Sequence, residues 1–455
     1  MGHAVLAASM VWICPIKKVA VIGAGITGVT TAYALVKRGF DVTVFERNRY
    51  AAMETSFANG GQLSASNAEV WNSAATVFNG IKWMLSSDAP LLLNPMPSWH
   101  KYSWIGEFLR QIPKYERNTV ETVHLAIVAR EYMFSIAEQE GIDFDLEKRG
   151  ILHVYADKKG FDAATKVNVL LNLGGLDRRP VTPSEMKLIE PAIQGQFYGG
   201  FFTLSDSTGD IHKFTRGLAD SSTRRGVRFA YDTEILRADA LADGRVQIVA
   251  RRDAQQSTDI VDAVVVCAGV HSRRFASMFG DHVNIYPVKG YSITVNLDDE
   301  ASQNGAPWVS LLDDAAKIVT SRLGHDRFRV AGTAENNGFS RDIRADRVAP
   351  LITWVRRNFP EVSTARVVPW AGLRLMLPSM LPRVGQGKRP GVFYNTGWPP
   401  RVDAVRLDGG NRRRQRRAFI WSCSPDSRGG LSCLLLGRET FRRREVATSS
   451  IRRRK

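Results

Sequence analysis

One stretch near the N-terminus, Val19–Glu46, restricts the possible folds more than any other part of the chain. It opens with a short apolar run, Lys18–Ile22, which indicates a buried β-strand. A helix is predicted over Ile26–Lys37, with Gly39 just past its end, and a second strand over Asp41–Phe45. Strand, helix and strand in this order and at these lengths predict a βαβ unit with two parallel strands.

Three glycines in G-x-G-x-x-G spacing join the first strand to the helix. Gly23 allows a tight turn, Gly25 lets the backbone approach a pyrophosphate, and Gly28 lets helix and strand pack closely. The helix N-terminus offers free N–H groups to the phosphates, and Glu46 stands where an acid accepts hydrogen bonds from ribose hydroxyls. We therefore expect a bound dinucleotide rather than an ordinary packing turn. The residues expected to contact it in this unit are Val21, Ile22, Gly23, Ala24, Gly25, Ile26, Thr27, Gly28, Glu46 and Arg47.

A polar segment that contains two glycines follows the second strand. It runs from Met53 to Gln62 and has the sequence METSFANGGQ. Backbone N–H groups and small hydroxyls in such a place can surround the second phosphate and the ribitol of a longer cofactor, although an ordinary surface loop has a similar composition. The residues expected to contact the cofactor here are Thr55, Ser56, Asn59, Gly60, Gly61 and Gln62, with Ala268 and Gly269 at the end of a later strand.

Two hydrophobic patterns alternate along the rest of the chain and predict two kinds of sheet. After Gly209 the α/β pattern returns, with a helix over Asp210–Arg225 and strands over Val227–Tyr231 and Asp262–Cys267. Alternating runs then predict antiparallel strands, followed by one more helix. These elements are Asn284–Asn296, Trp308–Leu312, Lys317–Arg322 and Arg327–Thr333, and the helix Arg344–Asn358.

The fold class predicted from these patterns is α/β, with a discontinuous Rossmann-type cofactor-binding domain and an inserted, mixed and largely antiparallel α+β substrate domain. The cofactor-binding domain is expected to comprise residues 17–65, 205–275 and 365–397. The substrate domain is expected at 66–204 and 276–364, an extension at 1–16, and an Arg-rich tail at 398–455. Within the substrate domain we expect a long helix over Asn118–Gln139, ended by Gly141, and a capping box at Thr182 and Glu185.

The net charge of +17 is concentrated at the C-terminus. Arg401–Lys455 holds 16 Lys and Arg against 5 Asp and Glu, so the rest of the chain is only mildly basic. Arg-rich runs such as Arg412–Arg417 can bind phosphate backbones. The tail has few aromatic residues and no recognisable nucleic-acid-binding module, so we expect no specific nucleic-acid partner. A basic nucleic-acid-binding protein is kept only as a remote alternative.

The cysteines and the N-terminus point to a reducing compartment. The four cysteines, Cys14, Cys267, Cys423 and Cys433, have neither disulfide nor metal-site spacing, so neither a disulfide nor a metal is expected. Met1–Pro15 is apolar but too short to span a bilayer, and it lacks the basic start of a secretory signal. We expect a cytoplasmic protein.

A second informative stretch, Trp370–Gly385, carries a cation in apolar surroundings. Arg374 is flanked by apolar residues and followed by Pro378 and Pro382. A guanidinium on such a rigid segment forms either a structural ion pair or a receptor for an anion, and the residues themselves leave both alternatives open.

Taken together, these motifs resemble the FAD-dependent D-amino acid dehydrogenases of the small-subunit type, within the wider group of D-amino acid, glycine and sarcosine oxidases. The resemblance covers about residues 17–397. It rests on VAVIGAGITGVTTAYAL, ETSFANGGQLS, the IKWM of residues 81–84, TGDIHKFTRGLA, YPVKGYSITV, and WAGLRLMLPSMLPRVG with FYNTG.

The resemblance implies a tightly bound FAD and oxidation of a D-amino acid such as D-alanine to its imino acid, which water converts to a keto acid and ammonia. Electrons would pass to a quinone or another carrier, which leaves open a peripheral contact with the inner face of the plasma membrane. By resemblance Arg374 binds the substrate carboxylate, and Lys289 and Tyr291 are wall residues near the flavin. The alternative within the group is an oxygen-using oxidase of the glycine or sarcosine type.

The resemblance stops abruptly after Gly397. The family continues with a His, further glycines and Gly-Trp-Thr, whereas this chain continues with Trp398-Pro399-Pro400-Arg401. Codons for Trp398–Arg406 can be chosen so that reading one base later gives Gly-His-Leu-Gly-Trp-Thr-Leu-Ser, the missing motif. We therefore expect that the tail is read out of frame, which makes an inactive relative a further alternative.

Overall fold

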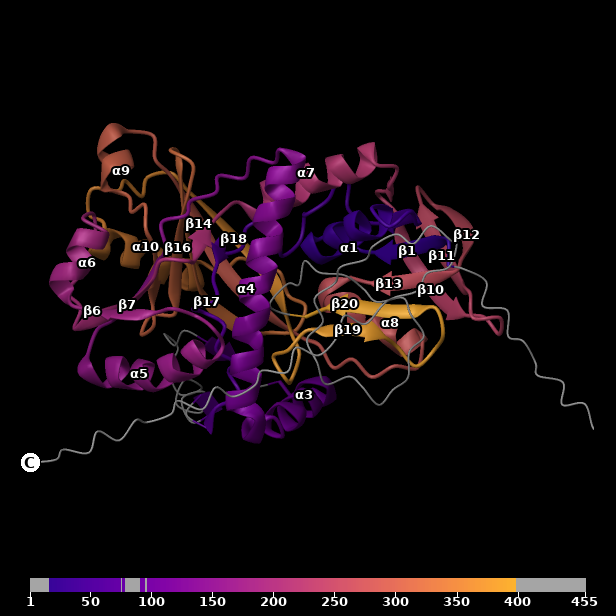
Figure 1. The fold of residues 1–455 in the computed structure, drawn as a ribbon, viewed down its shortest axis with the longest axis horizontal. Helices are drawn as coiled ribbons and strands as arrows, with labels where there is room; N and C mark the ends of the chain where they lie inside the picture. The colour runs from indigo at the N-terminus through magenta and orange to yellow at the C-terminus, as the bar shows by residue number, and fades with distance from the viewer. Residues whose placement is uncertain (1–15, 75, 78–90, 95, 398–455) are drawn as a thin grey trace, which may run out of the picture. The chain divides into compact units, whose positions relative to one another are not determined.

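The computed structural model describes residues 16–74, 76–77, 91–94 and 96–397, which all belong to one compact unit (Figure 1). The N-terminal 15 residues, the IKWM motif and the tail from Trp398 lie outside the described residues. The same holds for the predictions made about them.

A six-stranded sheet forms the cofactor-binding half. Its strand order is β19-β20-β13-β1-β2-β9, and every neighbouring pair is parallel except β19 with β20. The strands come from three separate segments of the chain. They are β1 (Lys18–Ile22), β2 (Asp41–Phe45), β9 (Arg228–Ala230), β13 (Ala263–Val266), β19 (Arg383–Gln386) and β20 (Val392–Thr396).

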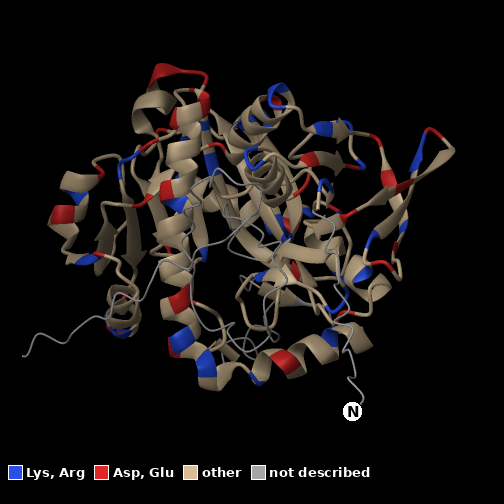
Figure 2. Cartoon of the chain, turned by 45° about the vertical axis from the view of Figure 1, so that its right-hand side comes forward, with Lys and Arg blue, Asp and Glu red and all other residues tan. Residues whose placement is uncertain are grey.

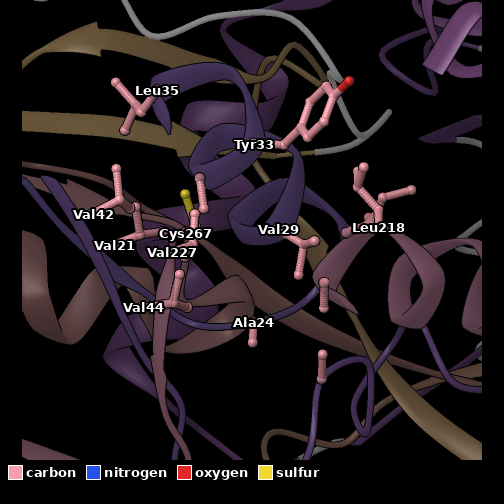
Figure 3. Close-up of a cluster of buried hydrophobic side chains, with 14 of the residues drawn as sticks. Val21, Ala24, Val29, Tyr33, Leu35, Val42, Val44, Leu218, Val227 and Cys267 are labelled. Carbon is pink, nitrogen blue, oxygen red and sulfur yellow. The ribbon is translucent and has the colours of Figure 1, made fainter. Parts of the chain in front are cut away.

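The predicted βαβ unit is confirmed almost residue for residue. β1 and β2 pair in parallel, and α1 (Ile26–Val36) connects them. The apolar residues of α1 pack on the sheet and on α7 (Ile211–Arg224), whose N-cap is Asp210. Figure 3 shows this cluster, whose members include Val21 of β1, Val29 of α1 and Leu218 of α7; Cys267 belongs to it as a buried free thiol. The apolar runs in the sequence therefore form the interior that holds the glycine turn in place.

A nine-stranded, mostly antiparallel sheet forms the second half. Its order is β18-β14-β17-β16-β15-β5-β7-β6, with β4 added beside β17. The strands are β4 (Leu91–Leu93), β5 (Ile151–Tyr155), β6 (Arg179–Val181), β7 (Gly199–Thr203), β14 (Tyr286–Asn296), β15 (Ser310–Asp313), β16 (Ile318–Leu323), β17 (Arg327–Asn336) and β18 (Val367–Met376). The predicted antiparallel strands are confirmed to within three residues at each end.

Two segments differ from the sequence-based expectation. β18 was expected in the cofactor-binding domain, but it pairs along its whole length with β14 and so forms an edge of the nine-stranded sheet. Residues 234–261 form a separate antiparallel sheet of β10 (Glu234–Ala240), β11 (Val246–Arg252) and β12 (Gln255–Val261). This sheet was not predicted, because β12 is exposed over nearly its whole length and has no apolar alternation.

The helices cover these sheets and carry the expected end signals. α10 (Ala345–Asn358) packs on β14 and β17, and α4 (Tyr115–Glu140) packs on α5 (Lys158–Leu173) and α7. α4 ends at Gly141, which is left-handed with a φ of 62°, and Thr182 and Glu185 form the predicted capping box. The remaining helical elements are α3 (Trp99–Leu109), α5 (Lys158–Leu173), α6 (Pro183–Ile189), α8 (Ser272–Met278), α9 (Glu300–Gly305), η1 (Ile112–Lys114) and η2 (Gly269–His271), and a short hairpin pairs β3 (Gln62–Leu63) with β8 (Ser207–Thr208).

Basic and acidic residues are interspersed over the described helices and loops, as Figure 2 shows. Across the described residues, no helix is both long and apolar enough to cross a membrane.

Candidate functional site

The glycine turn between β1 and α1 has the geometry that a pyrophosphate site requires. Gly23 has a φ of 99°, and a Cβ on Gly28 would lie 1.8 Å from the Gly23 carbonyl oxygen, so neither position admits a side chain. A Cβ on Gly25 would meet only Ser56 Oγ, at 3.6 Å. The backbone at Gly25 is therefore open to a ligand while the other two glycines are fixed by packing. Ala268 lies against the same turn, 3.3 Å from the position of a Gly23 Cβ.

Glu46 lies at the end of β2 and points back to the glycine turn. Its carboxylate accepts hydrogen bonds from the Ala24 N–H at 2.7 Å and from the backbone and side chain of Asn48 at 2.9 and 2.7 Å. Burial raises the pKa of Glu46, although these hydrogen bonds act in the opposite direction. The carboxylate is thus held beside the turn, and Oε2, which accepts only the Ala24 N–H, has a further lone pair for a ribose hydroxyl.

The segment Thr55–Gln62 joins the two sheets. Ser56 Oγ accepts a hydrogen bond from Ile26 N, the first residue of α1, at 3.1 Å. Thr55 Oγ1 donates to the carbonyl of Leu373 on β18 at 2.8 Å. Gln62 Nε2 donates to Ser310 Oγ at 2.8 Å. The predicted cofactor segment therefore starts at the helix N-terminus and ends on the nine-stranded sheet.

Two predicted residues flank this segment without lying in it. Arg47 forms an ion pair with Glu54 at 2.5 Å, and Arg341 pairs with the other oxygen of Glu54 at 2.5 Å. Gly269 begins η2 with a φ of 55°, directly after the end of β13. Both therefore border the carboxyl ends of the parallel strands, where ligands bind in sheets of this type.

Arg374 lies on β18, and its side chain extends over a glycine of β14, Gly290. In the β14–β18 pairing, Arg374 is opposite Val288 and Gly372 is opposite Gly290, so all four residues share one face of the sheet. A Cβ on Gly290 would lie 2.6 Å from Arg374 Nε, and one on Gly372 would lie 2.0 Å from the Trp370 ring. The two glycines are needed because the guanidinium and the indole occupy the space above them.

The Arg374 guanidinium has no partner among the described residues: none lies within hydrogen-bond or ion-pair distance of it. Burial lowers the pKa of Arg374 from its ordinary value, and no neighbouring charge offsets this. Of the two alternatives left open by the sequence, this geometry favours an anion receptor over a structural ion pair.

Lys289 and Tyr291 lie on the opposite face of β14 from Gly290 and Arg374. The Lys289 ammonium is fully buried, 2.9 Å from Glu335 Oε2, and donates to the carbonyl of Asp342 at 3.0 Å. Tyr291 OH donates to the same Glu335 oxygen at 3.1 Å, and Arg344 pairs with the other at 3.1 Å. Burial would lower the pKa of Lys289, but the hydrogen bonds with Tyr291 and Glu335 outweigh it and raise that pKa. The structure thus does not bring these two residues together with Arg374.

Sequence reasoning missed several residues of this region. Gly290 and Gly372 were inside recognised motifs, and a glycine in a strand interior is a signal of close approach that could have identified them. Ser292, Ser321 and Arg329, which contact the Thr55–Gln62 segment, carry no such signal. No group of acidic, His or Cys residues that could hold a metal occurs in the described part of the chain.

Comparison with known proteins gives a consistent picture. A family model described as FAD dependent oxidoreductase matches residues 18–401. D-amino acid dehydrogenase 3 of Mesorhizobium japonicum is 64% identical over 380 residues, which is 84% of this chain and 92% of that protein. D-amino acid dehydrogenase of Paramagnetospirillum magneticum is 40% identical over 392 residues, covering 84% and 90%.

Solved structures share the fold at low sequence identity. Glycine oxidase from Geobacillus kaustophilus superimposes with a TM-score of 0.66 at 20% identity, covering 84% of this chain and 89% of that one. L-alpha-glycerophosphate oxidase from Mycoplasma pneumoniae, a structure with FAD bound, gives a TM-score of 0.62 at 16% identity, covering 85% and 91%. These likenesses concern the fold alone.

Proposed function

This chain belongs to the FAD-dependent oxidoreductase family, and we propose that it oxidises D-amino acids, with D-alanine as the representative substrate, to the keto acid and ammonia. Both relatives reported above are named D-amino acid dehydrogenases, and one is 64% identical to this chain. FAD is the cofactor of the family. When bound it supplies the two-electron oxidant of the reaction.

The observation that carries the proposal is the unpaired guanidinium of Arg374. A planar fork with no acidic partner among the described residues is suited to bind a carboxylate through two parallel hydrogen bonds. Such a contact fixes the α-carbon of the substrate relative to the cofactor, and positioning of this kind lowers the barrier by several kcal/mol. We propose that Arg374 is the carboxylate receptor.

We propose that FAD is held by residues that the sequence analysis named. The open backbone at Gly25 and the N-terminus of α1 would accept the pyrophosphate, and Glu46 would accept the ribose hydroxyls. The Thr55–Gln62 segment would line the flavin side, because it runs from the α1 N-terminus to the strand that carries Arg374. Lys289 and Tyr291 are both buried on the face of β14 opposite to Arg374. In this proposal they therefore act by supporting β14.

The electron acceptor is the finer part of the proposal. A quinone or another carrier is supported by the names of the relatives, which are dehydrogenases. A quinone acceptor would require contact with the inner face of the plasma membrane from a cytoplasmic protein. An acceptor other than oxygen separates this proposal from an oxidase of the glycine or sarcosine type.

We also propose that the chain is read out of frame after Gly397. The family match ends at residue 401, and the basic residues beyond it are almost all arginine. Sequencing the gene around codon 397 tests this. An early stop in the shifted frame, or the absence of Gly-His-Leu-Gly-Trp-Thr there, would show that the tail is native.

The test of the proposed function is oxidation of D-alanine by the FAD-loaded protein, measured for this chain and for a chain with the shifted frame restored. We expect reduction of an artificial electron-accepting dye with D-alanine and none with L-alanine, with little oxygen consumption. Ammonia and pyruvate should appear in equal amounts. Oxygen consumption that matches turnover would favour the oxidase, and no oxidation by the restored chain would contradict the proposal.

A further inference from the structure

Three polar side chains of the nine-stranded sheet hold three consecutive carbonyl groups of the cofactor segment. Ser292 Oγ donates to Ala58 O at 2.9 Å, Arg329 Nη1 to Asn59 O at 3.1 Å, and Ser321 Oγ to Gly60 O at 2.6 Å. The three donors come from β14, β17 and β16, which are neighbours in the sheet. The segment also lies close to the sheet, since a Cβ on Gly60 would come within 2.8 Å of Val319 Cγ2.

Because a trans peptide group is planar, each carbonyl that faces the sheet turns the following N–H away from it. The N–H groups of Asn59, Gly60 and Gly61 are therefore directed away from the sheet. Gly61 N donates to Asn59 Oδ1 at 3.0 Å. The N–H groups of Asn59 and Gly60 donate to no residue in the described ranges. Two free donors thus stand side by side on the surface of the segment opposite the sheet.

These donors belong to the Thr55–Gln62 segment, which starts beside the glycine turn. Ser56, two residues before Ala58, accepts its hydrogen bond from the first N–H of α1. Consecutive backbone N–H groups pointing in one direction form a concavity that binds negative or partly negative atoms. The acceptor atoms of a flavin ring system have this character.

Arg329 strengthens the argument, because its burial is only partly compensated, by the Asn59 carbonyl and by the charge of Asp210. The side chain is 7% exposed, it forms no ion pair with a described carboxylate, and its Nε has no hydrogen-bond partner there. Burial lowers the pKa of Arg329 to about 10. A buried cation without an ion pair is costly, so its retention behind the Asn59 carbonyl points to a task at that peptide.

We propose that Ser292, Ser321 and Arg329 are positioning residues for FAD. They fix three carbonyls on the sheet, and so hold the N–H groups of Asn59 and Gly60 ready to donate to acceptor atoms of the flavin. Donors that are already in place cost no reorganisation when the ligand binds. The inference rests on the proposed function only through its cofactor, because FAD binding can be measured whether or not the chain oxidises D-amino acids.

The experiment is titration of the full-length apoprotein with FAD, with the dissociation constant, the flavin absorption spectrum and the apoprotein Tm as readouts. We expect S292A and S321A each to weaken FAD binding about fivefold, since each removes one hydrogen bond of roughly average strength. The double variant should lose more than either, and R329M should lose most. The flavin spectrum should shift in the double variant, because two donors to the ring are released.

The matched control is T294A, which deletes a hydroxyl two residues further along β14, on the same face as Ser292 but without a bond to the segment. It should bind FAD as the parent does. S292T and S321T keep the hydroxyl and should restore binding. FAD affinity within twofold of the parent in both alanine variants would overturn the proposal. So would a loss that follows apoprotein Tm and is not restored by threonine, or a parent chain that takes up no FAD.

Discussion

The two faces of the β14–β18 strand pair surround their cations in opposite ways, with Lys289 fully buried and Arg374 half-buried. On one face Lys289 is surrounded by Glu335, Tyr291 and a backbone carbonyl, with all its hydrogen-bonding capacity used. On the other face Arg374 has no partner among the described residues and lies above two glycines. Lys289 and Arg374 lie on directly paired strands and are one position apart in register, because Lys289 is opposite Leu373.

This contrast separates a structural charge from one that we propose is functional. A buried ion pair satisfies its own members and leaves nothing for a ligand, whereas an unpaired guanidinium stays available to an incoming anion. The same composition, a basic residue in an apolar strand, is compatible with either outcome. Whether the basic residue has an acidic partner determines which outcome applies. The following predictions test this for each face.

The largest effect is expected from R374A. Loss of the proposed carboxylate receptor should lower kcat/KM for D-alanine by about a hundredfold or more in an enzyme with the frame restored. The flavin spectrum should stay unchanged, because in the described part of the chain no hydrogen bond or ion pair links Arg374 to the proposed FAD-binding residues. R374K should recover only part of the activity, since an ammonium cannot reproduce the bidentate geometry. Steady-state kinetics of the three proteins decide the matter, and equal kinetics in R374A and parent would end the assignment.

The next effect concerns stability on the paired face. E335Q should lower the free energy of unfolding by about 3–5 kcal/mol, because it leaves the Lys289 ammonium buried without its counter-charge. The double variant K289M/E335L should recover most of that loss, as both charges are removed together. Urea denaturation of the three proteins measures this. A double variant less stable than E335Q would show that the pair is not the source of the effect.

A smaller effect is expected from the same kind of change on the unpaired face. R374M should alter the free energy of unfolding by no more than about 1 kcal/mol, with either sign, since no described carboxylate loses its partner. This outcome, set beside the one for E335Q, is the direct comparison of the two faces in one assay. A loss as large as that of E335Q would reveal a hidden partner for Arg374.

The smallest effect belongs to the exposed ion pairs of Glu54. Burial would raise the pKa of this carboxyl, but its hydrogen bonds with Arg47 and Arg341 outweigh that and lower it. A depressed carboxylate pKa stabilises the folded state above the unfolded pKa of about 4.5, and the contribution disappears as the pH falls below it. Because these side chains are 35–50% exposed, solvent screening limits it to well under 1 kcal/mol. E54Q should flatten the stability profile slightly between about pH 5 and 3, and an unchanged profile would contradict this.

The sequence predicted the glycine turn and its βαβ unit well, because their determinants are local. Gly23, Gly25 and Gly28 act within a few residues of each other, and the flanking apolar runs have lengths typical of one strand and one helix. The structure places each of them where the spacing implies. Contacts with distant parts of the chain therefore had little effect on the structure of this turn.

The partners of Arg374 and Lys289 could not be predicted in the same way. Lys289 finds Glu335 through the register of β14 with β17, and Arg374 faces Gly290 through the register of β14 with β18. Register depends on which strands pair, and the sequence did not predict that β18 pairs with β14. Polar residues inside strands, such as Ser292, give no periodic signal that distinguishes a residue supporting a ligand site from one that only packs in the core.

The six-stranded sheet has a consequence for synthesis of the protein on the ribosome. β13 ends at Val266, but β20, the strand that covers its outer edge, begins only at Val392. While the intervening chain is being translated, a fully apolar β13 presents an uncovered edge of N–H and C=O groups. Pairings between such distant segments form slowly and leave aggregation-prone surface exposed in the meantime. We therefore expect the nascent chain to depend on chaperone holding until residue 396 has left the ribosome, and slow codons before β20 to lower the soluble yield.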